Sequence, residues 1–289
     1  MWEERVALSP EYQTRLGRKT RYDEWDDRSP EADDRYARLL REQLTELDAA
    51  FDRANLSEDG QLNYDLFIAT TENNLALEAF RMHRYPLSQF RGIHSSIPVF
   101  LKNDHEIETV SDADAYIARV ASVDQVLDQA ASQLEARVRA GFTLPEFSYP
   151  LMAEAAENNV TGKSVREDFA EKLVKLDLTD EERGRLQGEL EAALEGPYAA
   201  GFEDFAARIG SLADEVAGSG NFGVGRFDDG EAYYAALLRN YTTTDLTADE
   251  VHDIGLAEVA RIQNEMRAIM EEVGHDGSLE EFFEFMRTD

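Results

Sequence analysis

The feature that most constrains this chain is an apolar repeat of helical period, bounded by residues that start and stop helices. Its clearest example lies in residues 247–274. Thr247 can cap a helix with its hydroxyl, and Glu250, three residues later, completes a capping box. Gly274 ends the segment. Because the apolar residues between these limits are three or four positions apart, with one gap of five, they line one helical face. These residues are Val251, Ile254, Val259, Ile262, Met266, Ile269 and Val273.

The same pattern recurs along nearly the whole chain. Ser9 and Ser29 each precede a proline that suits the first position of a helix. Ser111, with Asp114 three residues later, predicts a single helix that runs to about residue 140. No stretch shows the alternation of a strand. About ten helices with short connections predict an all-α, multi-helix array, folded as a single domain over residues 1–289.

Two stretches interrupt the helices. Residues 82–98, MHRYPLSQFRGIHSSIP, contain Pro86, Gly92 and Pro98 and predict a long loop. Residues 218–230, GSGNFGVGRFDDG, form the most flexible stretch by composition. We interpret the second stretch as a surface loop within one domain rather than as a linker.

The charge of the chain is strongly negative. Sixty acidic residues oppose 29 basic ones, for a net charge of −31, and only five of the basic residues are lysine. Self-repulsion at this charge destabilises a compact state in dilute buffer, and molar salt screens it. This composition favours adaptation to high salt, as in a halophile. An acidic binding protein or a nucleic-acid mimic is the alternative, but such proteins concentrate charge in blocks, whereas here it is spread along nearly every helix.

Other features of the composition limit the location and partners of the protein. The chain has no cysteine, so it forms no disulfide and performs no thiol chemistry. No run approaches the roughly 20 apolar residues of a membrane helix, and the first twelve residues lack an apolar signal segment. Binding to nucleic-acid phosphates is disfavoured by the sign of the charge. We therefore expect a cytoplasmic protein with no membrane or nucleic-acid partner.

Several segments resemble one known family. TTTDLTADEVHDIGLAEVARIQNEM, followed by GSLEEFFEFMRTD, is similar to the middle of the domain-of-unknown-function 885 (DUF 885) family. Upstream, the segments SPEYQTRLG, YDEWDD, LNYDLF and YPLSQFRGIHSSIP resemble successive parts of the same family in the same order. The resemblance spans about residues 9–289. The family resembles helical gluzincin-type zinc metallopeptidases, so it implies a fold like the N-terminal part of such a peptidase.

The resemblance also implies that this chain is incomplete as an enzyme. The zinc motif of the family, His-Glu-x-x-His, lies in a C-terminal half that this chain does not contain. In the complete architecture, zinc would polarise a peptide carbonyl and activate water, with the glutamate as base. The resemblance therefore implies the N-terminal portion of a larger two-part protein, inactive alone, with zinc only in the full-length architecture.

The spacing of the histidines also predicts that this chain lacks a zinc site. A zinc peptidase helix needs two histidines four residues apart, and none of the five histidines has a partner at that spacing. Asp249 with His252, and Glu272 with His275, have the spacing of half a di-iron site. The first pair lies in a first helical turn that favours acids anyway, and the second pair straddles Gly274. We expect no metal site and no catalytic residue in this chain.

The loop from Tyr85 to Pro98 is the candidate functional surface. Gln89, Arg91 and His94 can hydrogen-bond a peptide backbone or carboxylate, and Tyr85 begins the loop. In a gluzincin-like architecture the N-terminal helices form one wall of the substrate channel, so the resemblance places this loop there. The alternative is a structural crossover whose aromatic residues pack and whose polar groups cap helices.

Two functions remain open from the sequence. The chain is either the substrate-channel wall of a metallopeptidase-like hydrolase, or a non-enzymatic helical binding or scaffold protein. We expect the last helix, which carries a dense apolar group, either to fray or to pack against another polypeptide, which is the missing half or a second copy. This group consists of Phe282, Phe283, Phe285 and Met286.

Overall fold

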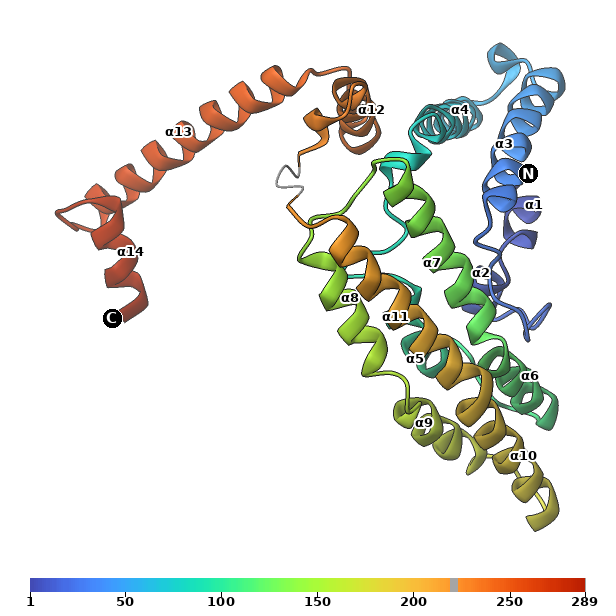
Figure 1. Cartoon of the computed structure of the whole chain (residues 1–289). Coiled ribbons are helices and arrows are strands. Elements are labelled where there is room, and N and C mark those ends of the chain that lie inside the picture. The colour runs from blue at the N-terminus through green and yellow to red at the C-terminus, as the bar shows by residue number, and fades with distance from the viewer. Residues whose placement is uncertain (219–222, 289) are drawn as a thin grey trace. The chain divides into compact units, whose positions relative to one another are not determined.

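The computed structural model describes residues 1–218 and 223–288, and the regular structure in these ranges is helical throughout (Figure 1). The only strand-like pairing in them is an isolated bridge between Ser88 and Arg91. The predicted all-α array is therefore confirmed. The chain divides into two compact units, Met1–Arg226 and Phe227–Asp289, called unit 1 and unit 2 below. That the chain is a single domain stays a prediction.

Unit 1 contains eleven of the α-helices that the described residues form. They are α1 (Trp2–Ala7), α2 (Pro10–Arg15), α3 (Pro30–Ala50), α4 (Glu58–Glu78), α5 (Ile93–Asn103), α6 (Val110–Ala121), α7 (Val123–Arg139), α8 (Ser148–Glu157), α9 (Lys163–Leu173), α10 (Asp180–Ala193) and α11 (Ala199–Glu215). Short 3₁₀ turns η1 (Arg53–Asn55), η2 (Arg81–His83) and η4 (Val224–Arg226) lie between helices, and a π-type turn, η3 (Leu194–Tyr198), joins α10 to α11. Unit 2 contains α12 (Gly230–Thr242), α13 (Ala248–Glu272) and α14 (Leu279–Thr288).

The predicted caps explain where several helices begin. The hydroxyls of Ser9 and Ser29 accept hydrogen bonds from the backbone at the starts of α2 and α3, each with proline in the first turn. Thr247 and Glu250 form the predicted capping box of α13. Gly274 then adopts φ +70°, a left-handed conformation that glycine tolerates, and α13 ends just before it.

The predicted helix from Ser111 to about residue 140 is wrong at its start and in its middle. The capping box consists of Thr109 and Asp112, so α6 begins at Val110. The helix is also divided at Ser122, whose hydroxyl donates to the backbone oxygen of Ala118 at 3.0 Å. A serine hydroxyl that bonds the preceding turn competes with the helical backbone and favours a bend.

The predicted loop from Tyr85 to Pro98 is also wrong in its second half, because α5 begins at Ile93 and continues through Pro98. A proline inside a helix leaves the carbonyl four residues earlier without its usual donor. Here that carbonyl belongs to His94, and it accepts a hydrogen bond from the Asn159 amide at 3.3 Å. The turn after α8 therefore supplies the donor that Pro98 lacks.

Of the predicted flexible stretch 218–230, residues 219–222 lie outside the described residues. The rest is partly ordered by helical structure, because η4 covers Val224–Arg226 and α12 begins at Gly230. The backbone N–H of Gly218 donates to a Glu146 carboxylate oxygen at 2.8 Å.

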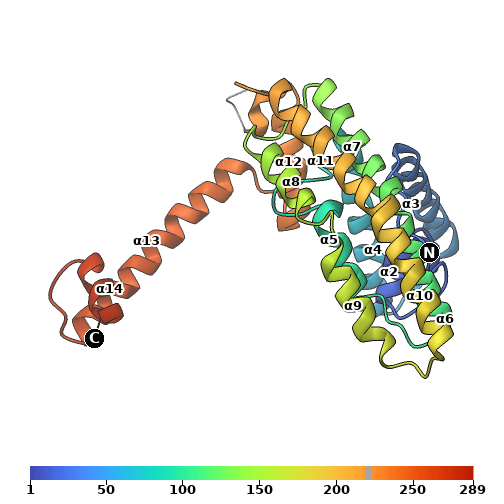
Figure 2. The same ribbon diagram turned by 60° about the horizontal axis from the view of Figure 1, so that its bottom comes forward.

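The core of unit 1 lies between α11, α7 and α8, which run side by side in both views (Figures 1 and 2). Phe202, Phe205 and Ile209 of α11 are fully buried there. The close approach of α11 to α7 requires glycine at position 201, since a Cβ there would lie 2.6 Å from the Asp124 Cα. In the described part of the chain, no helix combines the length and the apolar character needed to cross a membrane.

Candidate functional site

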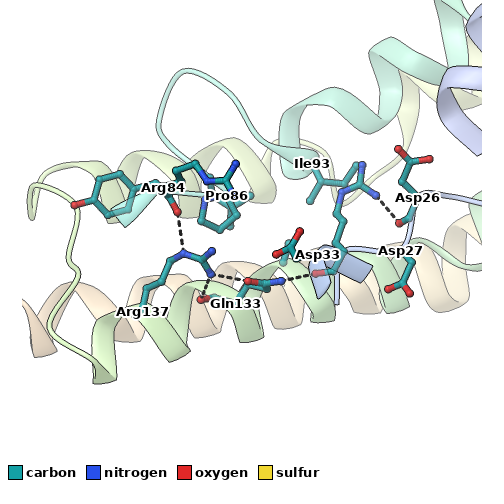
Figure 3. A pocket seen from close by; sticks show the side chains of 12 residues that line it. Asp26, Asp27, Asp33, Arg84, Pro86, Ile93, Gln133 and Arg137 are labelled. Atoms are coloured by element: carbon teal, nitrogen blue, oxygen red, sulfur yellow. Dashed lines mark hydrogen bonds between the residues drawn. The ribbon is translucent and has the colours of Figure 1, made fainter. Parts of the chain in front are cut away.

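A cavity of about 450 Å³ opens in unit 1 beside the predicted functional loop, and we call it the α3–α7 cleft (Figure 3). This volume is in the range of small-ligand sites. Its walls come from the segment before α3, the first turn of α3, the segment after η2, the start of α5 and one face of α7. The lining residues are Asp26, Asp27, Arg28, Asp33, Arg84, Tyr85, Pro86, Leu87, Ile93, Ala130, Gln133 and Arg137.

A second cavity, of about 320 Å³, adjoins the cleft. The two cavities share Asp33, Gln133 and Arg137 as lining residues. Met82 and Ala136 add apolar surface to the second cavity. Together the cavities form a continuous surface along α7 that has charged and apolar parts.

Arg137 fixes one wall of the cleft. It is 6% exposed, and its Nε donates to the Arg84 carbonyl at 2.8 Å while Nη2 donates to the Arg81 carbonyl at 3.1 Å. Its Nη1 donates to the backbone and side-chain oxygens of Gln133 (Figure 3). Burial lowers the pKa of Arg137, although a guanidinium remains a cation in proteins. A buried cation therefore ties the segment that leads to Tyr85 onto α7.

Gln133, one turn before Arg137 on α7, ties the segment before α3 to the same helix. Its Nε2 donates to the Arg28 carbonyl at 2.6 Å, and the Arg28 guanidinium pairs with Glu11 at 2.7 Å. Arg84 likewise pairs with Glu78, at 3.1 Å. Both of these arginines thus already have carboxylate partners.

The three carboxylates of the cleft differ in their surroundings. Asp26 accepts from the Ser9 hydroxyl and from the Glu11 backbone, while burial and the charge of Glu11 raise the pKa of Asp26. Asp27 pairs with Arg35 at 2.5 Å. Burial opposes the ionised form of Asp27, but the hydrogen bonds from Arg35 and the Ser29 backbone outweigh it and lower its pKa.

Asp33 is the exception among these carboxylates. It is half-buried and lines both cavities. Within residues 1–218 and 223–288, its side chain makes no hydrogen bond and no ion pair.

The structure separates the four residues that the sequence grouped as a site. Tyr85 lines the cleft, and its hydroxyl donates to the Thr143 carbonyl at 2.8 Å. Burial raises the pKa of Tyr85. Gln89 and Arg91 lie in the turn closed by the Ser88–Arg91 bridge and do not line the cleft.

His94 lies away from the cleft in the core. It is 1% exposed and stacks on Phe205, with ring centroids 5.4 Å apart. Burial lowers the pKa of His94 to about 4. Whether Tyr85, Gln89, Arg91 and His94 bind a substrate stays a prediction, but the structure brings only Tyr85 to this cavity.

Sequence reasoning missed most of the cleft. One signal was present: Arg137 follows Ala130 by seven residues and Leu134 by three, so it lies on the buried face of α7. A basic residue on an apolar helical face often marks a polar site. Asp33 gave no such signal, because an acid in the first turn of a helix is common.

A second cluster of buried charges, centred on Arg119, has internal partners throughout. Arg119 is fully buried and donates to the Thr14 hydroxyl at 2.7 Å and to the Glu24 carbonyl at 3.0 Å. Its Nη1 atom also lies 2.9 Å from the Nδ1 atom of His105. Burial, with the charge of Arg119, lowers the pKa of His105 to about 3, so the ring is a neutral acceptor. We interpret this cluster as structural.

Lys172 extends the same buried network. Its ammonium pairs with Asp168 at 3.0 Å and donates to the carbonyls of Leu101, Lys102 and His105 at the end of α5. A cation at a helix C-terminus satisfies carbonyls that have no helical donor. The ammonium has no free position for a ligand.

The residues that the structure describes do not fit a zinc site. No three or more histidine, aspartate or glutamate side chains in the described ranges are arranged so that they could hold a metal ion. The two Asp/Glu-x-x-His turns therefore do not combine into a larger ligand set. That zinc belongs only to a longer architecture stays a prediction.

The all-α array with its charged cleft is that of a known protein family. The model of the family described as "Bacterial protein of unknown function (DUF885)" matches residues 10–289. The chain belongs to this family. No curated protein matches the chain.

One similar solved structure supports the fold. It is "the putative lipoprotein from Colwellia psychrerythraea", with a TM-score of 0.79 and 18% sequence identity. The match covers 100% of this chain and 52% of the other, so this chain spans about half the length of that protein. At this identity the likeness concerns the fold alone.

Proposed function

We propose that the chain is the substrate-channel wall of a metallopeptidase-like hydrolase and binds peptides without cleaving them. The α3–α7 cleft carries this proposal, because it is a cavity of ligand size that combines fixed charges with apolar walls. Membership of the family and the half-length match to a longer solved structure support it.

In this function the chain's own residues bind and orient. Arg137 and Gln133 hold the walls, and Tyr85 closes one end with its hydroxyl fixed by Thr143. An extended peptide can lie along α7 through both cavities, with side chains against Met82 and Ala136. Peptide-bond cleavage would need the zinc motif that the resemblance assigns to another half.

Hydrogen exchange with tetra-alanine at saturating concentration tests the proposal. We expect slower exchange in residues 81–93 and 130–137, and no hydrolysis with or without added zinc. Arg185, an exposed residue paired with Asp114, reports a surface outside the cleft. Cleavage of the peptide by this chain alone, or unchanged exchange around the cleft, would overturn the proposal.

A second function is favoured by one observation in unit 2. Ile254, Val259 and Ile269 of α13 are 51%, 53% and 50% exposed, which is unusual for an apolar helical face. A non-enzymatic binding or scaffold protein would use this face, with Phe283, Phe285 and Met286 of α14, to hold another polypeptide. We propose two partners, a C-terminal half of the kind that the resemblance implies and a second copy of this chain.

Sedimentation over a range of concentrations separates these partners. A second copy predicts association that is lost when Phe285 and Met286 are both replaced by serine. A monomer at every concentration points to a different polypeptide. A cytoplasmic location and adaptation to high salt also stay proposals.

A further inference from the structure

We infer that the α3–α7 cleft binds the protonated amino terminus of a peptide, with Asp33 as its counter-ion. This inference rests on the proposed function and specifies which part of the peptide the cleft recognises. It follows from a comparison of the charged groups that line the cleft.

The cations of the cleft are already engaged. Arg28 pairs with Glu11, and Arg84 pairs with Glu78. Four hydrogen bonds from Arg137 go to oxygens of residues 81, 84 and 133. A ligand carboxylate would have to share these guanidinium groups with their internal carboxylate and carbonyl partners.

Among the anions that line the cleft, only Asp33 has no hydrogen-bond or ion-pair partner within the described residues, although its charge acts at longer range on Arg137 and Arg81. Asp27 pairs with Arg35, and Asp26 accepts from Ser9 and the Glu11 backbone. Asp33 is half-buried beside two cavities and has no hydrogen-bond or ion-pair partner within the described residues. A partly desolvated carboxylate gains most from a cation that can also donate hydrogen bonds.

An ammonium group fits this carboxylate better than a metal ion does. No group of three metal-ligating side chains occurs in the described residues, so Asp33 would be a single protein ligand. An ammonium needs no such set, since its three N–H groups can bond one carboxylate and water.

The position of Arg137 favours a peptide terminus over a lysine side chain. A guanidinium has five N–H groups, and Arg137 donates four hydrogen bonds to its neighbours, which leaves one N–H. Asp33 and Arg137 line the same two cavities, and Figure 3 shows both side chains in the cleft. A peptide amino terminus always has a carbonyl next to it, which can accept from that N–H. A lysine ammonium has none.

Calorimetric titration of the full chain with three peptides tests the inference. The probes are tetra-alanine, N-acetyl-tetra-alanine and tetra-alanine amide, at an ionic strength of about 0.1 M. We expect acetylation to weaken binding by about tenfold or more, because hydrogen bonds to charged groups contribute about 1.5–3 kcal/mol. Amidation of the carboxyl end should change affinity little.

Two variants separate recognition by Asp33 from the general attraction of a chain with net charge −31. Glu31 and Asp33 both lie in the first turn of α3, but only Asp33 lines the cleft. Asp33→Asn should abolish the preference for the free amino terminus, and Glu31→Gln should retain it. Both variants remove one negative charge from the same helical turn, so they match in net charge and in helix-dipole effects.

The outcomes distinguish this inference from the function on which it rests. Equal binding of free and acetylated peptide by the wild-type chain overturns terminus recognition and leaves peptide binding intact. The same holds if amidation, rather than acetylation, weakens binding, since the cleft would then recognise a carboxylate. If a peptide carrying a lysine side chain but a blocked terminus binds as well as tetra-alanine, Asp33 is a general cation site and the inference is wrong. No binding by any peptide overturns the proposed function itself.

Discussion

Helix α11 in unit 1 and helix α13 in unit 2 have similar apolar repeats and opposite surroundings. In α11, Phe202, Phe205 and Ile209 are at most 1% exposed. In α13 only Met270 is buried, and Ile262 is 40% exposed. A helical apolar repeat therefore specifies a face that is able to pack, and whether that face is buried depends on a neighbouring helix.

The number of buried charged side chains also distinguishes unit 1 from unit 2. Unit 1 buries Arg119, Arg137 and Lys172, each with hydrogen-bond partners. Among the described residues of unit 2, no charged side chain is buried. Burying a charge requires many surrounding groups, and only a packed array of helices supplies them.

The largest effect that we expect comes from Arg119. Arg119→Met leaves the Glu24 carbonyl and the Thr14 hydroxyl buried without their donor, so unit 1 should lose about 3–5 kcal/mol of stability. Urea denaturation followed by circular dichroism measures this loss. Arg185→Met, at an exposed ion pair, is the control and should change the midpoint little. Equal effects of the two variants would show that the buried network does not distinguish unit 1.

A matched pair of isoleucines compares the two helices directly. Ile209→Ala in α11 should cost about 2–5 kcal/mol, because a fully buried side chain leaves a cavity. Ile262→Ala in α13 should cost much less, because the side chain is partly exposed and alanine favours helix. Hydrogen exchange within each helix reports each change separately. A large loss for Ile262→Ala would mean that α13 is covered in solution.

The pH dependence of stability should belong mainly to unit 1. The pKa of His94 falls from 6.5 to about 4 on burial, so the folded state favours the neutral ring. This contribution is complete above pH 6.5 and is lost as the pH falls from 6.5 towards 4, by about 1–3 kcal/mol. His94→Phe keeps a ring against Phe205 and removes the proton site. Urea midpoints at pH 7 and pH 4.5 should therefore differ less in the variant, and an unchanged difference would exclude His94 as the cause.

The smallest effect that we expect is stabilisation of the helices by salt. This stabilisation should be larger in unit 2 than in unit 1. Residues 227–289 carry sixteen acidic and four basic side chains, a net charge of −12. Residues 1–226 carry −19 over a much longer stretch. Since molar salt reduces the Debye length to about 3 Å, repulsion is screened most where charge is densest. Hydrogen exchange in α13 should slow more than in α11 between 0.1 and about 1 M potassium chloride. Equal responses would mean that charge density does not separate the two units.

The sequence determined the fold class and many helix limits. Thr247, Ser29 and Gly274 act locally, through one hydroxyl or one backbone conformation, so their roles follow from neighbouring residues alone. The same local reasoning failed at Pro98. The donor that allows a helix there is Asn159, sixty-one positions later in the chain.

Which residues line the cleft depends on the tertiary structure. Asp33, Tyr85 and Arg137 come from α3, the segment after η2 and α7, and they meet only because the helices pack side by side. Tyr85 was predicted from its loop, but His94, nine residues later, points into the core because α5 turns it towards Phe205. Sequence fixes which side chains a helix displays, since its period is a property of the backbone. Which of them share a cavity depends on how helices far apart in the chain pack together.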